Sequence, residues 1–519
     1  MTRSTTMNLT IENAMTFVEK VAEKLGGANS IKEMTSLQMF GYGQYAYMWG
    51  GGNISASPDA PQKYMAANEL QRNWNFKEDT FQMKERRNML FPFAAEFGHA
   101  FYPLNQVLDG EIAYDILPDG TMKRVAEFLQ DPLTVDGRRI RRLWSLTNPV
   151  VVLHELLNHK LTVEHIQEKT DLVELALATA AGDKLKFLVD KRSLLPEQIK
   201  WNTAQTNLGE VTFTTTFTGY MPFDDLHFPM GYSTKINFRD IVYFKVYVDG
   251  YRVNRDVKSV QAPEHIASAD IPQEFLPPLS VERVDDGVWR IAGIGGTTVI
   301  EFDDHLTLFE LYWNQTQAKA IIDLANTLVP GKKATDLIIS HHHFDHTGGF
   351  RAAVAQGLRI YANRENEGIL REMAQRETPD FEDIITPTTD RNFEFVPIDE
   401  HIRLEDSKTI LDIYRVISNS HMADAVFAYL PQQQIFMDSD IATAGFDWQF
   451  WPDSYLDNLE RYELQVSKVT TVHEKVLTHS EVLAYIEAGK QRIQERHVKY
   501  LGMNEYLPGF PVFRTRKDN

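Results

Sequence analysis

The stretch that decides the fold runs from residue 340 to residue 350 and reads Ser-His-His-His-Phe-Asp-His-Thr-Gly-Gly-Phe. A short apolar run, Leu337 to Ile339, precedes it and is typical of a β-strand. Within six positions the stretch holds the metal-capable side chains His341, His343, Asp345 and His346. A strand that ends by bringing imidazoles and a carboxylate into one small volume needs a cation there, because such groups must otherwise be paired or hydrated. The stretch therefore predicts metal-assisted hydrolysis.

Two directions of projection follow from the spacing of these residues. His341 and His343 are two positions apart just after a strand, so in an extended segment their side chains lie on the same side. Asp345 and His346 come where the chain must turn toward the glycine pair Gly348–Gly349. Two adjacent cations satisfy these directions more easily than one. Further ligands must then come from the ends of other strands.

The sequence offers three such ligands after other strand-like runs. His421 lies in a polar loop between two apolar runs, and Asp440 follows the run from Gln434 to Met437. His473 ends the β-branched run from Val469 to Val472. Because active-site loops gather at strand ends, we expect all three side chains to join the stretch at 340–350.

Residues 280 to 500 resemble the metallo-β-lactamase superfamily, and this resemblance rests on the residues named above. The stretch is similar to that of a bacterial group of large hydrolases, whose signature reads roughly Thr-His-His-His-Phe-Asp-His-Ser-Gly-Gly. The resemblance implies an αββα sandwich with a dinuclear metal site. Carried over position by position, it implies one metal held by His341, His343 and His421, a second held by Asp345, His346 and His473, and a bridge between them by Asp440.

Two of these ligands have rivals. The family usually has His-Gly at the last histidine, whereas this chain has His473 followed by Glu474. His479 is the alternative; we prefer His473 because it ends a β-branched run, while His479 stands at the start of the next predicted helix. Asp438 is a lesser alternative to Asp440.

The chain contains no cysteine, which excludes disulfides, thiolate zinc sites and cysteine nucleophiles. Zinc β-lactamases of one major type use a thiolate in the second site, so the resemblance points instead to the thioester, lactone and phosphodiester hydrolases with a bridging aspartate. The redox branch of the superfamily has glutamate in place of the second histidine, and His343 argues against it. A mononuclear iron dioxygenase stays open, because such relatives keep the same histidines.

Two zinc ions are the expected cofactors, since a histidine-rich site with carboxylates suits zinc, and manganese or iron are the alternatives. Cations that share a water lower its pKa from about 15.7 toward about 7. Asp345 is the expected catalytic residue, because it can orient the hydroxide and then carry a proton. We expect a hydrolase that cleaves an ester, lactone or thioester bond of a small apolar substrate. The alternatives are the dioxygenase, a phosphodiesterase on the same fold, and an apolar-ligand-binding protein with a vestigial metal site.

Charge and hydropathy limit the partners. With 53 basic and 72 acidic residues the formal net charge is −19, which repels polyanions, so a small molecule rather than nucleic acid is expected. No window approaches the ~18 apolar residues of a membrane span. The amphipathic beginning, residues 11–25, is typical of a helix rather than of a signal peptide, and predicts a cytoplasmic location.

At 519 residues the chain is too long for one ordinary core. Residues 1–265 predict an N-terminal α+β domain with an antiparallel sheet, because strand-like runs follow one another without helices between them. Residues 266–279 predict a linker, and residues 280–519 the metallo-β-lactamase-like catalytic domain. Aromatic side chains between residues 213 and 247 predict either an ordinary sheet core or an apolar concavity that shapes the substrate site or forms a homodimer surface.

Overall fold

The computed structural model describes residues 10–48, 53–60, 62–89, 102–125, 137–271, 277–419, 421–442 and 453–504. The chain forms two compact units. Unit 1 comprises Met1–Asn53, Pro58–Phe275 and Arg376–Asp383, and unit 2 comprises Ile54–Ser57, Leu276–Gln375 and Ile384–Asn519. Part of the predicted linker, residues 272–276, lies outside the described residues.

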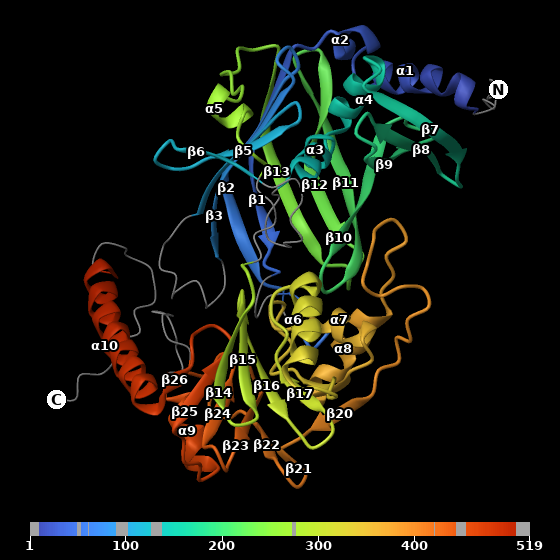
Figure 1. Ribbon diagram of the computed structural model, residues 1–519. Helices are drawn as coiled ribbons and strands as arrows, with labels where there is room; N and C mark the ends of the chain where they lie inside the picture. The colour runs from blue at the N-terminus through green and yellow to red at the C-terminus, as the bar shows by residue number, and fades with distance from the viewer. Residues whose placement is uncertain are drawn as a thin grey trace. The chain divides into compact units, whose positions relative to one another are not determined.

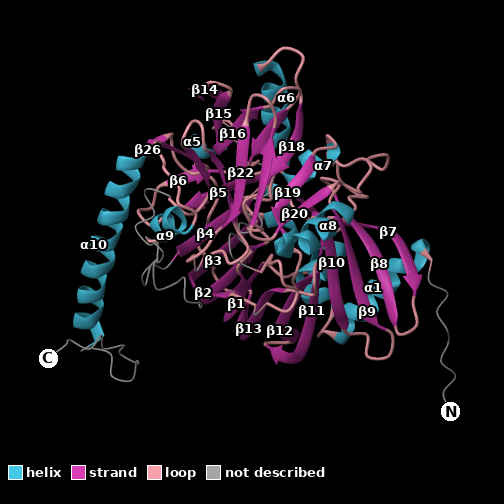
Figure 2. Cartoon of the chain, turned by 90° about the horizontal axis from the view of Figure 1, so that it is seen from below, coloured by secondary structure: helices cyan, strands magenta, loops and turns pink. Residues whose placement is uncertain are grey.

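Unit 1 is built on a 13-stranded sheet with the order β6-β5-β4-β3-β2-β1-β13-β12-β11-β10-β9-β8-β7. Neighbouring strands run antiparallel, and Figure 2 shows β10, β9, β8 and β7 side by side. The strands are β1 (Ser36–Ala46), β2 (Tyr64–Asn75), β3 (Thr80–Met89), β4 (Tyr102–Asp109), β5 (Ile112–Ile116), β6 (Met122–Arg124), β7 (Leu161–Glu168), β8 (Leu172–Thr179), β9 (Lys184–Asp190), β10 (Pro196–Gln205), β11 (Gly209–Phe223), β12 (Leu226–Ile236) and β13 (Val242–Val253).

The helices of unit 1 cover part of this sheet and complete its core. They are η1 (Ile11–Asn13), α1 (Ala14–Lys24), α2 (Ala28–Lys32), α3 (Arg138–Ser145), α4 (Pro149–Leu157) and α5 (Glu264–Ala267). Trp144 of α3 packs against Trp201, Phe213, Tyr243 and Phe244, with ring centroids 5.5 to 6.2 Å from its own. Phe213, Tyr243 and Phe244 therefore belong to a sheet core, whereas Tyr247 is exposed. The predicted N-terminal α+β domain with an antiparallel sheet is confirmed.

A segment from the second half of the sequence belongs to unit 1. In Arg376–Asp383 the guanidinium of Arg376 donates to the backbone oxygens of Leu208 (2.5 Å) and Glu210 (2.7 Å). Asp380 accepts a hydrogen bond from Asn202 of β10 at 2.9 Å. The ring of Phe381 lies 5.0 Å from the guanidinium carbon of Arg139 in α3. Unit 1 is thus made from chain segments on both sides of residues 276–375 of unit 2.

Unit 2 contains two mixed sheets (Figure 1). The 7-stranded sheet has the order β14 (Ser280–Asp285), β15 (Val288–Gly293), β16 (Gly295–Glu301), β17 (Leu306–Phe309), β18 (Ala334–Ile338), β19 (Arg359–Asn363) and β20 (Phe395–Ile398), parallel from β17 onward. The 6-stranded sheet has the order β21 (His401–Glu405), β22 (Ile410–Arg415), β23 (Val426–Leu430), β24 (Ile435–Asp438), β25 (Lys468–Thr471) and β26 (Leu477–Thr478), with β24 and β25 parallel.

The two sheets of unit 2 enclose one apolar core and are flanked by helices. Phe309 and Ile338 of the first sheet pack with Ile413 and Met437 of the second in one buried cluster. The outer face of the second sheet packs against α9 (Ser454–Arg461) and α10 (His479–Asn504). The other helices are α6 (Gln315–Leu328), α7 (Phe350–Ala355), η3 (Arg364–Asn366) and α8 (Glu367–Gln375), and α6 contacts β15 and β18 of the first sheet. The predicted αββα sandwich is confirmed.

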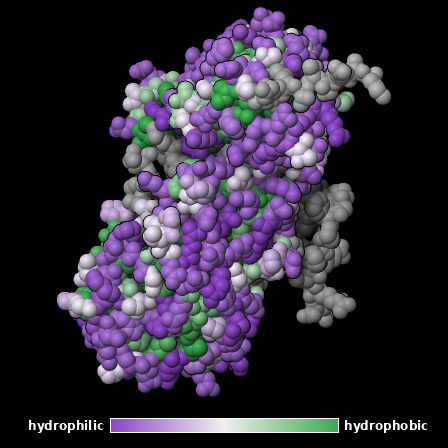
Figure 3. Space-filling model, turned by 90° about the vertical axis from the view of Figure 1, so that its right-hand side faces the viewer, coloured by the Kyte–Doolittle hydropathy of each residue, from purple (hydrophilic) through white to green (hydrophobic). Residues whose placement is uncertain are grey.

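The hydropathy of the surface and of the helices is the last feature of the fold. The face shown in Figure 3 is mostly hydrophilic. Among the described helices, none combines the length and the apolar character that crossing a membrane requires.

Candidate metal centre

The seven candidate ligands follow the ends of buried strands of unit 2. The stretch from His341 to His346 comes just after β18, whose last three residues are buried. His421 lies between β22 and β23, Asp440 comes after β24, and His473 comes after β25. Because β18 and β24 belong to facing sheets that share one core, their ends bring these loops together.

The side chains form two adjacent groups. His341, His343, His421 and Asp440 make up the first, and Asp345, His346 and His473 the second; within each group the candidate ligand atoms lie within 4.8 Å of one another. The structure therefore brings together all seven residues that the sequence singled out. Their service as metal ligands stays a prediction.

Asp440 lies between the two groups. Its Oδ2 atom is 3.0 Å from His421 Nε2 and 3.4 Å from His341 Nε2, both of the first group. Its Oδ1 atom is 2.9 Å from His473 Nε2 and 3.4 Å from His346 Nε2, both of the second. One oxygen thus faces each group, which is the geometry that a bridging carboxylate needs.

The centre is almost closed to water, and its polar atoms are not all satisfied. His341 is 0% exposed, His343 2% and His346 1%. Among the described residues, neither Nδ1 of His343 nor Oδ1 of Asp345 has a hydrogen-bond partner, although both atoms are buried. Leaving such atoms unpaired costs about 1–3 kcal/mol each. Imidazole nitrogens and carboxylate oxygens are zinc ligands, so the donor set fits a cation.

Electrostatics set the protonation states of these residues. Burial, as the main cause, and repulsion by His346, as the second, lower the pKa of His341 to about 4. The imidazole of His341 is therefore neutral at pH 7, which is the state that a metal ligand requires. Burial alone would raise the pKa of Asp440, but the attraction of His346 and His473 outweighs it and holds that pKa well below the usual value. Burial opposes protonation of His346, yet Asp440, Asp345 and Glu310 together raise its pKa well above the usual value. Negative charge therefore prevails around His346, where a cation is expected.

His479 and Asp438, the two alternative ligands, contact residues outside the two groups. The Nδ1 atom of His479, the first residue of α10, is 2.9 Å from the hydroxyl of Tyr455. The carboxylate of Asp438 accepts hydrogen bonds from the backbone N–H groups of Ile441 (2.8 Å) and Ala442 (2.6 Å). Neither residue belongs to the two groups described above.

Two supporting contacts escaped the sequence reasoning. The carboxylate of Glu310 accepts a hydrogen bond from the backbone N–H of Ser340 at 2.6 Å and lies 3.4 Å from His346 Nδ1. The Nδ1 atom of His342 lies 2.6 Å from the carboxylate of Asp424. A usable signal for Glu310 was its position, an acid directly after the buried strand β17.

The glycine pair after the motif allows two loops to approach each other. A Cβ atom on Gly348 would lie 2.0 Å from the carbonyl oxygen of Trp313, and one on Gly349 would lie 2.4 Å from that of Leu311. Gly349 N–H donates to Leu311 at 3.0 Å, and Trp313 N–H donates to the carbonyl of Asp345 at 2.8 Å. The loop after β17 thus contacts the stretch at 340–350 at Asp345 and at the glycine pair.

Comparisons with known proteins give distant similarities. No protein-family model matches the chain. The linear primary-alkylsulfatase of a Pseudomonas species is 32% identical over 88 residues, which are 15% of this chain and 13% of that protein's length. The match thus spans a small part of this relative.

Several solved structures are similar to the chain at low sequence identity. A metallo-β-lactamase from Pontibacter korlensis is 17% identical and aligns over 41% of this chain and 99% of its own, with a TM-score of 0.33. The metallo-β-lactamase FIM-1 from Pseudomonas aeruginosa in its mono-zinc form is 16% identical over 41% of this chain and 96% of its own, with a TM-score of 0.31. Unit 2 of this chain has two facing sheets, flanking helices and the His-x-His-x-Asp-His stretch at the end of a strand. It therefore has the metallo-β-lactamase fold that the sequence predicted.

Proposed function

We propose that unit 2 is a metal-dependent hydrolase with a dinuclear centre. The observation that carries the proposal is the position of Asp440, with one carboxylate oxygen toward each group of donor side chains. Zinc ions in such a centre would supply a water whose pKa is lowered toward about 7, and thus a nucleophile at neutral pH. The donor set, three imidazoles near one carboxylate oxygen and two imidazoles with a carboxylate near the other, supports zinc; manganese and iron are the alternatives.

The side chains have separate tasks in this proposal. His341, His343 and His421 would hold the first cation, Asp345, His346 and His473 would hold the second, and Asp440 would face both. The carboxylate of Asp345 would also orient the attacking water and accept its proton. The near-complete burial of His341, His343 and His346 excludes bulk water from that part of the centre, which strengthens the charge interactions there.

An ester-type bond of a small, apolar substrate is the proposed target: a carboxylic ester, a lactone or a thioester. The relative described as an alkylsulfatase adds alkyl sulfate esters to the classes that deserve testing. In each case a hydroxide would attack a centre whose oxygen gains negative charge, and cations held by these ligands would supply the positive charge that stabilises it. A phosphodiesterase or a mononuclear iron dioxygenase would use the same histidines.

Metal analysis and a substrate panel test the proposal together. We expect about two zinc ions per chain, and turnover of at least one member of a panel of aryl esters, lactones, thioesters, alkyl sulfates, phosphodiesters and a chromogenic β-lactam. Asp345→Ala should lower that turnover at least about 100-fold. His479→Ala serves as the control, because His479 contacts Tyr455 instead. Equal turnover by the wild type and Asp345→Ala would refute the mechanism, and one iron per chain would favour the dioxygenase.

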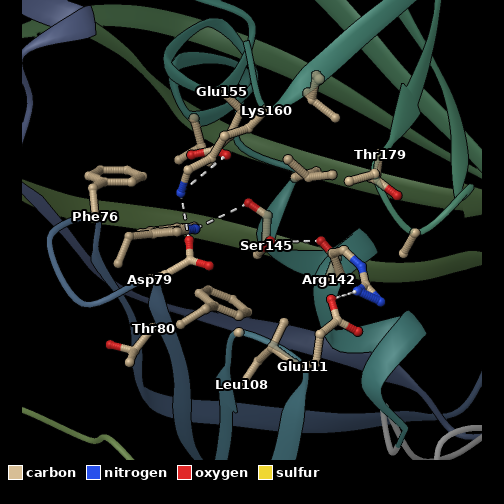
Figure 4. Close-up of a pocket in the computed structure, with 18 of the residues that line it drawn as sticks. Phe76, Asp79, Thr80, Leu108, Glu111, Arg142, Ser145, Glu155, Lys160 and Thr179 are labelled. Carbon is tan, nitrogen blue, oxygen red and sulfur yellow. Dashed lines mark hydrogen bonds and ion pairs between the residues drawn. The ribbon is translucent and has the colours of Figure 1, made fainter. Parts of the chain in front are cut away.

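A second candidate function is supported by a cavity in unit 1. This cavity of about 450 Å³ lies among β2, β3, α3, α4, β7 and β8 (Figure 4). Trp74, Phe76 and Phe81 give it an aromatic wall. Its charged groups pair with one another, since Lys160 lies 2.6 Å from Asp79 and Arg142 lies 2.8 Å from Glu111. The size is that of small-molecule pockets, and the wall suits an apolar ligand.

Fluorescent-probe binding distinguishes this function from hydrolysis. If the cavity holds an apolar ligand, an anilinonaphthalene sulfonate probe should bind to the wild type with one site per chain. Val151→Phe, which fills the cavity from α4, should weaken that binding at least about tenfold. Asp345→Ala should bind the probe as the wild type does. Probe binding that is unchanged by Val151→Phe would remove the cavity as a ligand site.

A further inference from the structure

Tyr312 contacts every member of the second ligand group. Its hydroxyl donates to Oδ2 of Asp345 at 3.2 Å. Its ring meets the rings of His473 and His346 edge to face, with centroids 5.0 Å and 5.3 Å away. The side chain is only 7% exposed, so these contacts are shielded from water.

The position of Tyr312 is itself fixed by its surroundings. The residue belongs to the loop after β17, which binds the motif through the hydrogen bond from Trp313 N–H to the carbonyl of Asp345. The buried side-chain amide of Gln317 donates to the carbonyl of Tyr312 at 3.1 Å. A Cβ atom on Gly295 would lie 2.5 Å from the ring of Tyr312, so the backbone of Gly295 packs directly against that ring. These contacts fix the backbone of Tyr312 beside the second group.

The hydrogen bond from Tyr312 distinguishes the two oxygens of Asp345. Because Oδ2 accepts the hydrogen bond of the Tyr312 hydroxyl, that oxygen is held toward Tyr312. The other oxygen, Oδ1, is buried and has no hydrogen-bond partner within the described part of the chain. A carboxylate held in this way presents one oxygen, in one direction, to a cation. The first group has a different support, since His341 Nδ1 lies 2.8 Å from the hydroxyl of Ser340.

We propose that Tyr312 is a positioning residue for the second cation site: it holds Asp345, His346 and His473 in place and so gives that site its affinity, while the first site does not depend on it. The inference rests on the proposed function, in which the centre holds two cations. Residues that orient metal ligands through hydrogen bonds typically change metal affinity by about 10- to 100-fold when they are replaced.

The test compares zinc binding by metal-free wild type and Tyr312→Phe, in competition with a chromogenic chelator. Phe keeps the ring and removes only the hydroxyl. We expect the first zinc ion to bind both proteins equally and the second to bind the variant about 10- to 100-fold more weakly. Tyr429→Phe is the matched control, since Tyr429 is a buried tyrosine of unit 2 whose hydroxyl donates to Gln465 at 2.5 Å. This control should bind both zinc ions as the wild type does.

A spectroscopic measurement adds a readout that does not depend on stability. When cobalt is added stepwise, the visible absorption of the second equivalent should differ between Tyr312→Phe and the wild type, and that of the first should not. Unchanged binding of the second zinc ion, or equal weakening of both, would overturn the inference while the proposed function stands. A wild type that binds fewer than two zinc ions would overturn both.

Discussion

The Nε2 atom of His473 lies 2.9 Å from Oδ1 of Asp440, and this contact sets His473 apart from the nearby His479. His473→Ala should therefore remove one of two bound zinc ions and abolish most of the turnover. His479→Ala should keep both ions and lose only about 0.5–1.5 kcal/mol of stability, the usual contribution of one hydrogen bond, here to Tyr455. Metal analysis after dialysis checks both variants. Loss of zinc from His479→Ala alone would reverse the assignment.

Asp440 and Asp438 allow a similar comparison. Asp440→Asn keeps the shape of the side chain but removes the charge that faces both groups, so both zinc ions should bind at least about tenfold more weakly. Asp438→Asn should retain zinc. It should lower the free energy of unfolding by about 1–3 kcal/mol, because an amide accepts through only one of its two atoms, and Ile441 and Ala442 both donate to this side chain. Zinc titration and urea unfolding measure the two effects separately.

Gly348 should tolerate no side chain. A methyl group there would lie 2.0 Å from the backbone oxygen of Trp313, so Gly348→Ala must displace the loop after β17 or the stretch at 340–350. We expect a loss of about 1–3 kcal/mol, together with weaker zinc binding. Gly368→Ala is the control, since no atom lies within 4 Å of its added methyl group and it is in helix α8. That variant should match the wild type or gain up to about 1 kcal/mol. Thermal unfolding with and without zinc gives the comparison.

A buried carboxylate in unit 1 should make stability depend on pH. Glu85 lies 2.6 Å from both Arg72 and Arg87, and its side chain is 2% exposed. Burial alone would raise its pKa, but the two guanidinium groups outweigh burial and lower it. A carboxyl with a lowered folded-state pKa contributes stability above its unfolded-state pKa of about 4.3, and this contribution disappears as the pH falls through the folded-state pKa.

Glu85→Gln should consequently lose about 3–5 kcal/mol at pH 7, because two buried guanidinium groups lose their counter-charge. The difference from the wild type should shrink as the pH falls below about 4. Glu69→Gln, which removes the exposed partner of Arg86, should change stability by less than about 1 kcal/mol. Urea unfolding at pH 7 and at lower pH measures the difference. A gap between the wild type and Glu85→Gln that grows as the pH falls would contradict the assigned direction.

The fold of unit 2 could be predicted from the sequence because its signals are local. An apolar run that begins at residue 337, the four candidate ligands between residues 341 and 346, and a glycine pair follow one another closely. His421, Asp440 and His473 each follow a strand, and strand ends meet at the edge of a sandwich. The two-sheet fold inferred from these features is confirmed, while the ligand roles await metal analysis.

Contacts between distant segments could not be read in this way. In the large sheet β1 pairs with β13, so that Leu37 lies opposite Val253, and nothing in either segment names its partner. Tyr312 looks like an ordinary loop residue until the fold brings Asp345 against it. Such contacts depend on the geometry of two loops, which no local pattern records.

The segment Arg376–Asp383 has a consequence for how such a chain can evolve. Because Arg376 supplies hydrogen bonds to Leu208 and Glu210, unit 1 is encoded on both sides of a large part of unit 2. A single recombination event near residue 275 would exchange the N-terminal part of unit 1 without its segment Arg376–Asp383. The two units are therefore expected to be inherited together, and a gene shortened to the first 275 codons should yield a polypeptide that unfolds more readily than unit 1 of the full-length protein.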